Sequence, residues 1–100
     1  MNFEKKMAKE ISRKMLARDE SRNFQIDKIC LAPNAKLSPH FHPDVEWIFV
    51  LRGEFIDERG TFRAGDFFVN ERDSVHTVCS GAKGCDLLCC WCGRIEEVLK

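Results

Sequence analysis

The sequence lacks any long run of apolar residues, and it carries no net charge at pH 7. A signal peptide needs an apolar core of about 7–15 residues and a membrane-spanning helix needs about 20, and neither pattern is present. We therefore expect a cytoplasmic protein with no membrane partner. The charge is uneven, because residues 1–22 carry +3 and the remainder carries −3. We interpret the basic segment as a solvated helix face, so no nucleic acid is expected as a partner.

The sequence also lacks internal repeats and low-complexity segments. Its 100 residues suffice for one domain, and an apolar content of 44% makes a packed core possible. The six cysteines would suggest disulfides in a secreted protein of this size. In a reducing cytoplasm they are better explained as buried thiols or metal ligands.

An amphipathic helix is predicted for residues 1–22. Apolar residues recur there every four positions, and Lys, Arg and Glu fill the positions between them. The recurring positions are Phe3, Met7, Ile11 and Met15. We expect this helix to pack on the rest of the molecule.

From residue 23 onward, short apolar stretches alternate with turn residues. Such stretches are typical of strands, and closely spaced turns are typical of antiparallel sandwiches and barrels. The predicted strands are 24–32, 36–42, 46–56, 61–63, 67–69, 75–80 and 85–92, with a turn at 81–84 before the last. The predicted fold class is therefore all-β with an N-terminal α-helix, and residues 23–100 form a single domain.

The longest predicted strand is apolar on both faces. Because side chains alternate along a strand, Ile48 and Val50 lie on one face. Trp47, Phe49 and Leu51 lie on the other face. Both faces should therefore be covered, one by the barrel interior and one by the helix, a second sheet or another subunit. A homodimer is the expected assembly.

Two of the three histidines, His40 and His42, stand one residue apart in a predicted strand. Alternation points both imidazoles the same way, so they can bind one metal ion. Glu46 has matching parity if the turn between them keeps the register, and His76 lies on a separate predicted strand. A lone strand histidine is usually just a hydrogen-bonded polar residue, but the combination favours a metal site. Imidazoles with one carboxylate suit zinc, iron, nickel, manganese or copper.

This spacing resembles the two motifs of the cupin superfamily. The first motif, H-x-H-x(3)-E-x(6)-G, is matched by His40, His42, Glu46 and Gly53. The Gly, Asp and His of the second motif are matched by Gly65, Asp66 and His76. The resemblance covers about residues 24–92. It implies a double-stranded β-helix, a jelly-roll-like barrel, with the three histidines and the glutamate binding one metal ion inside it.

Within the superfamily, residues 40–85 are most similar to ChrR-type cupin domains. The matching segments are 50–55, 57–60, 62–65, 70, 74–76 and 84–85. ChrR is an anti-sigma factor whose cupin domain binds zinc and responds to oxidative stress. The resemblance thus implies a regulatory module, with a sigma factor or other regulator as partner. The sequence departs from the motifs at Asn34, Glu71 and Asp73, none of them a ligand position, and residues 1–22 are too few for ChrR's helical sigma-binding domain.

A cluster of thiols ends the last predicted strand. Cys90 and Cys92 share one face of a strand, and Cys89 points the opposite way. Core packing is one interpretation, and a reactive thiol or a group beside the metal is the other. If this strand runs inside the barrel, Cys90 or Cys92 could approach the metal ion.

Three functions are compatible with these patterns. The first is a sensory or regulatory module with a mainly structural metal ion, and the second is a small non-haem metal-dependent dioxygenase with open coordination positions. The third is a stand-alone cupin that binds a small molecule. No separate catalytic acid or base can be named, so the sequence leaves enzyme and sensor both open. The expected cofactor is one divalent transition metal ion, with zinc or iron ahead of nickel and manganese.

Overall fold

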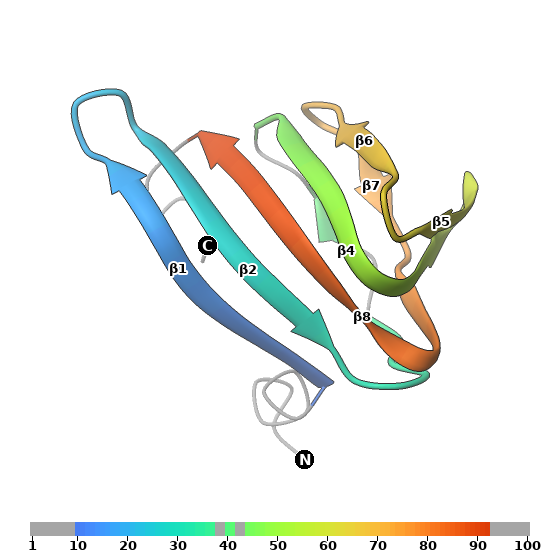
Figure 1. Ribbon diagram of the computed structural model, residues 1–100. Helices are drawn as coiled ribbons and strands as arrows, with labels where there is room; N and C mark the ends of the chain where they lie inside the picture. Colours follow the sequence, from blue (N-terminus) through green and yellow to red (C-terminus); the bar gives the residue numbers. More distant parts are fainter. Residues whose placement is uncertain (1–9, 38–39, 42–43, 93–100) are drawn as a thin grey trace, which may run out of the picture.

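In the computed structural model, the described residues of the chain form eight strands (Figure 1). The structure describes residues 10–37, 40–41 and 44–92. The strands are β1 (Ile11–Asp19), β2 (Phe24–Leu31), β3 (His40–Phe41), β4 (Glu46–Asp57), β5 (Gly60–Arg63), β6 (Phe67–Asn70), β7 (Val75–His76) and β8 (Cys79–Cys92). Every element named among these residues is a strand, which confirms the all-β class. The described residues contain no helix long and apolar enough to cross a membrane.

The strands form two antiparallel sheets. The large sheet has the order β1-β2-β8-β4-β5, and β6 pairs with the first half of β4. The small sheet consists of β3 and β7, which Figure 1 shows behind β4 and β6. The inner face of the large sheet is the side turned toward this small sheet.

The core lies on the inner face of the large sheet, because β2, β4 and β8 alternate between buried and less buried residues. In β2 the odd-numbered residues from 25 to 31 are buried, and in β8 the odd-numbered residues from 85 to 91 are buried. The buried apolar residues are Ile29, Leu31, Ala35, Leu37, Ile48, Val50, Phe55, Phe68, Val78, Cys85, Leu87, Cys89 and Trp91.

Strand β4 confirms the predicted separation of its two faces. Ile48 and Val50 are 3% and 0% exposed and point into the core. Phe49 and Leu51 are 37% and 41% exposed on the opposite side. The second apolar face is therefore formed as predicted, but the described part of the chain leaves it accessible to solvent.

The predicted N-terminal helix is wrong for residues 11–19, which form β1 and pair along their length with β2. A spacing of four residues is even, so it fits the two-residue period of a strand as well as one helical turn. Ile11 packs against the core, while Met15 is 54% exposed at the sheet edge. The part of the predicted helix over residues 1–9 lies outside the described residues.

The predicted turn at residues 81–84 is a large bulge within one continuous strand, β8. Cys85 pairs with Gly53 and Ser80 with Phe55, so four residues of β8 lie opposite one residue of β4. Gly53 has a φ of 78°, and a Cβ there would collide with the Gly84 carbonyl. The glycine of the first motif is thus required for a close approach of two strands.

Candidate metal centre

Strands β3 and β7 bring two of the predicted metal ligands together. Their register places His40 opposite His76 and Phe41 opposite Val75. The chain reaches β3 through a turn in which Asn34 has a φ of 53°, a left-handed conformation that asparagine tolerates better than most residues. His42, the other predicted ligand in this segment, lies outside the described residues.

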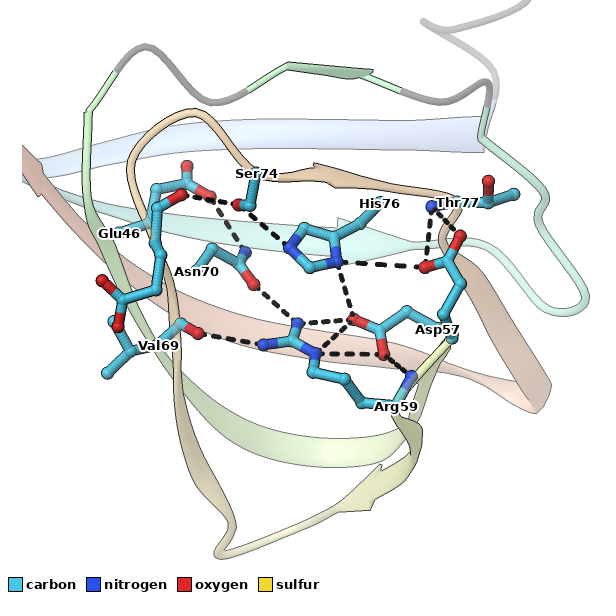
Figure 2. Close-up of polar contacts among 10 residues, drawn as sticks. Glu46, Asp57, Arg59, Val69, Asn70, Ser74, His76 and Thr77 are labelled. Carbon is cyan, nitrogen blue, oxygen red and sulfur yellow. Dashed lines mark hydrogen bonds and ion pairs between the residues drawn. The ribbon is translucent and has the colours of Figure 1, made fainter.

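The ring of His76 faces two acidic side chains (Figure 2). Its Nδ1 lies 3.7 Å from Asp57 Oδ2 and 3.9 Å from Glu58 Oε1, and its Nε2 lies 3.1 Å from Ser74 Oγ. Three ligand atoms, one each from Asp57, Glu58 and His76, lie within 4.8 Å of one another. These three residues could therefore hold a metal ion. Of the three, only His76 is predicted as a ligand by the sequence.

Arg59 binds the Asp57 carboxylate. Its Nη2 lies 2.5 Å from Asp57 Oδ2, and its Nε and backbone N–H also donate to this carboxylate. Burial raises the pKa of Asp57, but the hydrogen bonds and charge of Arg59 outweigh it and lower the pKa below its ordinary value. The guanidinium also lies over the rings of Phe62 and Phe68, at 5.4 and 5.1 Å from their centroids.

Arg59 also connects the Asp57 and His76 side of the site to Glu46. Arg59 Nη2 donates to Asn70 Oδ1 at 2.6 Å, and Asn70 Nδ2 donates to Glu46 Oε1 at 3.2 Å. Strand pairing supports this contact, because Glu46 of β4 lies opposite Asn70 of β6. Glu46 and His76 therefore stand at the two ends of one chain of polar contacts that runs through Asp57, Arg59 and Asn70 (Figure 2).

The thiol beside Glu46 belongs to Cys89, whose Sγ donates to Glu46 Oε2 at 3.5 Å. Cys89 is fully buried, and burial together with the Glu46 charge raises its pKa, so the thiol stays protonated. Cys90 instead lies opposite Trp47 on the outer side of the sheet, and Cys92 shares that parity. Cys89, rather than Cys90 or Cys92, is thus the thiol that lies next to Glu46. All six cysteines are free thiols.

Asp57 and Arg59 are not predicted as members of the site from local sequence, because their segment has the composition of a hairpin turn. It does form the turn between β4 and β5. The missed signal is parity: Asp57 lies two residues beyond the buried Phe55, so its carboxylate faces inward. An acidic residue on the inner face calls for a cation, and Arg59 is two residues away.

A comparison with protein-family models shows which family the chain belongs to. The model of the ChrR cupin-like domain matches residues 2–91. The chain belongs to the ChrR cupin-like domain family. A search of curated proteins finds no match.

Solved structures share the fold of this ChrR-type cupin. An RmlC-like cupin from Shewanella frigidimarina has a TM-score of 0.74 and 23% identity, over 88% of this chain and 80% of its own. The Rhodobacter sphaeroides SigE complex with anti-sigma ChrR has a TM-score of 0.72 and 22% identity, over 80% of this chain and 44% of that chain. An acetylacetone dioxygenase from Acinetobacter johnsonii has a TM-score of 0.72 and 12% identity, over 83% of this chain and 60% of that chain. The cupin barrel is confirmed, and this chain spans about half the length of several matched chains.

Proposed function

We propose that this ChrR-type cupin is a sensory or regulatory module that holds one divalent transition metal ion inside its barrel. The proposed ligands are His40, His42, Glu46 and His76. The observation that carries the proposal is the chain of polar contacts between Glu46 and His76, because a connected network holds two ligands in fixed relative positions.

The backbone register supports this donor set. Residues directly opposite in an antiparallel pair have Cβ atoms about 4.5–5.5 Å apart, and His40 is opposite His76. The carboxylates near Nδ1 of His76 favour a proton on that nitrogen, and Nε2, which lies 3.1 Å from Ser74 Oγ, would exchange that contact for a metal ion. Histidines that bind metals commonly donate their other ring N–H to a carboxylate in this way.

The same contacts argue against Asp57 as a ligand. Arg59 already binds both carboxylate oxygens of Asp57, and its positive charge would repel a cation placed there. Asp57 is therefore better suited to orient His76 than to bind a metal ion itself. Glu58, the third member of that group, is more than half exposed and accepts the backbone N–H of Thr77.

Zinc or iron fits the proposed donor set best, with nickel and manganese as alternatives. When bound, such an ion supplies a Lewis acid and positions for a small-molecule ligand. In the regulatory role, binding of a ligand or an oxidant at this centre would alter contact with a partner protein. We propose a homodimer as the assembly and a sigma factor or another regulator as the partner class, which the SigE complex of ChrR supports by analogy.

A small non-haem dioxygenase is the second candidate. The observation that favours it is the donor set itself, because imidazoles with one carboxylate also suit iron with open positions. Identity of the bound metal separates the two candidates. Zinc at full occupancy in protein purified without added metal supports the regulatory role, and iron with oxygen uptake on small diketones or thiols supports the enzyme.

The site assignment is tested by metal content, measured by mass spectrometry on paired variants. Glu46→Gln and His76→Ala should lose most of the bound metal, while Glu58→Gln should retain it. Loss in Glu58→Gln with retention in Glu46→Gln would assign the ion to the group of Asp57, Glu58 and His76 instead. A wild-type chain that binds no metal would refute the proposal.

A further inference from the structure

The outer face of the large sheet carries a broad apolar surface. Across the strand order β1-β2-β8-β4-β6, the register aligns one row of side chains on this face. The row consists of Lys14, Lys28, Leu88, Phe49 and Phe67. A parallel row consists of Ala17, Ile26, Cys90, Trp47 and Val69. We call these two rows the outer face.

Nothing in the described part of the chain covers the outer face, which is turned toward the viewer in Figure 1 with no strand in front of it. Phe67 is 61% exposed and Phe49 is 37% exposed. Contiguous apolar surface of this kind on a small domain marks an interaction site. Lys14 and Lys28 are also directly opposite each other, and like charges at such positions destabilise a sheet unless other groups compensate them. Within the chain, Asp86 on the same face interacts with Lys28.

The order of residues along the first row is self-complementary. Its two lysines lie at one end, its two phenylalanines at the other, and Leu88 of the central strand β8 lies between them. A two-fold axis along β8 would place Lys14 over Phe67 of a second copy and Lys28 over Phe49, with Leu88 against itself. Ammonium groups bind the faces of aromatic rings. Contacts that repeat in both directions are the defining property of a two-fold interface.

Charges at the two edges agree with this arrangement. At the β6 edge, Asp66 directly before Phe67 and Glu71 directly after Asn70 are both exposed. The same axis brings this edge of one copy toward β1 of the other, where Lys14 lies. A second copy would thus add aromatic rings and acidic groups to the compensation that Asp86 already gives Lys28.

We propose that the outer face binds a second copy of this chain through a two-fold axis along β8, with the lysine end of one copy over the phenylalanine end of the other. This inference rests on the homodimer that the proposed function includes, and it assigns the surface and its orientation. The metal centre lies on the opposite side of the sheet, because Glu46 and Cys89 belong to the inner face. The two proposals can therefore fail independently.

Sedimentation of the full chain over a range of concentrations tests the interface. Phe67→Lys places a third positive charge next to Lys14 and Lys28 of the other copy. It should therefore raise the dimer dissociation constant at least tenfold. Phe67→Glu removes the same ring but supplies an opposite charge, so it should weaken the dimer less. Combining Lys14→Glu with Phe67→Lys should restore association. Met15→Lys, which adds the same charge at an exposed position opposite the inward-facing Asp27, should have no effect.

Circular dichroism and metal content on the same samples separate the possible failures. Every variant should stay folded and retain its metal. A wild-type chain that sediments as a monomer throughout would overturn it and leave the outer face to a different protein. A dimer that Phe67→Lys weakens no more than Phe67→Glu would overturn the proposed orientation. Absence of metal in a normal dimer would refute the metal centre alone.

Discussion

Two buried carboxylates on the inner face of the large sheet, Asp57 and Asp27, differ in the groups that compensate their charge. Both side chains are 0% exposed. Asp57 has a local cation, Arg59, at 2.5 Å. Asp27 accepts hydrogen bonds from the indole of Trp91 and the amide of Gln25, each at 2.8 Å.

The cation nearest to Asp27 is less closely held than Arg59. Arg13 Nη1 lies 3.7 Å from Asp27 Oδ2, and the Arg13 side chain is 44% exposed to solvent. The partners of Asp27 come from three neighbouring strands, β1, β2 and β8, whereas Asp57 and Arg59 belong to one hairpin. Asp27 therefore joins strands, while Asp57 and Arg59 connect His76 with Glu46, two of the proposed metal ligands.

The largest expected effect is on stability, in Asp27→Ala. This change leaves the buried donors of Trp91 and Gln25 without their acceptor, which we expect to lower the free energy of unfolding by about 3 kcal/mol. Urea denaturation measures the loss. Metal content per folded molecule should not change, and a loss of metal without a loss of stability would reverse the roles of the two carboxylates.

An intermediate effect is expected for Arg59→Met, and the property affected is metal affinity. Without the guanidinium, Asp57 and Asn70 lose their common partner, so metal affinity should fall about 10–100-fold. Arg59→Lys retains the positive charge but not the several donor groups of the guanidinium. Its metal affinity should therefore lie between those of Arg59→Met and wild type. Competition with a chromogenic chelator measures affinity. Arg63→Met removes an exposed arginine paired with Glu54 and should leave the affinity unchanged.

The smallest expected effect is the pH dependence contributed by Asp57. Its pKa is lower in the folded chain than in the unfolded chain, so its stabilising contribution is present above about pH 4 and is lost as pH falls through the folded-state pKa. Asp57→Asn should therefore be less stable than wild type near neutral pH, with the difference narrowing in acid. Chemical denaturation across this range tests it, and a constant difference would contradict the lowered pKa.

Local patterns in the sequence predicted the strands well where both periodicity and turn residues agreed. The separation of Ile48 and Val50 from Phe49 follows from alternation alone, and burial confirms it. The same reasoning failed for Ile11 and Met15, because a four-residue spacing fits a helix and a strand equally. Pairing with β2 decides in favour of the strand, and this pairing is not visible in local sequence.

In the candidate site, too, the sequence predicts some residues and only the tertiary structure reveals the others. The motif spacing predicts Glu46 and His76 as parts of one site, and the structure joins them through Asp57, Arg59 and Asn70. No spacing rule identifies those three as connecting residues, because their contacts depend on how the β4–β5 hairpin meets β6 and β7.

By itself, the sequence determined the all-β class, the two faces of β4 and the family to which the chain belongs. These depend on side-chain alternation, turn chemistry and ligand spacing, which act over a few residues. Tertiary structure alone decided that residues 11–19 are an edge strand, that Cys89 rather than Cys90 approaches Glu46, and that Arg59 links both ends of the site. Each of these depends on strand register and on distances between distant segments, which are set only when the whole sheet is assembled.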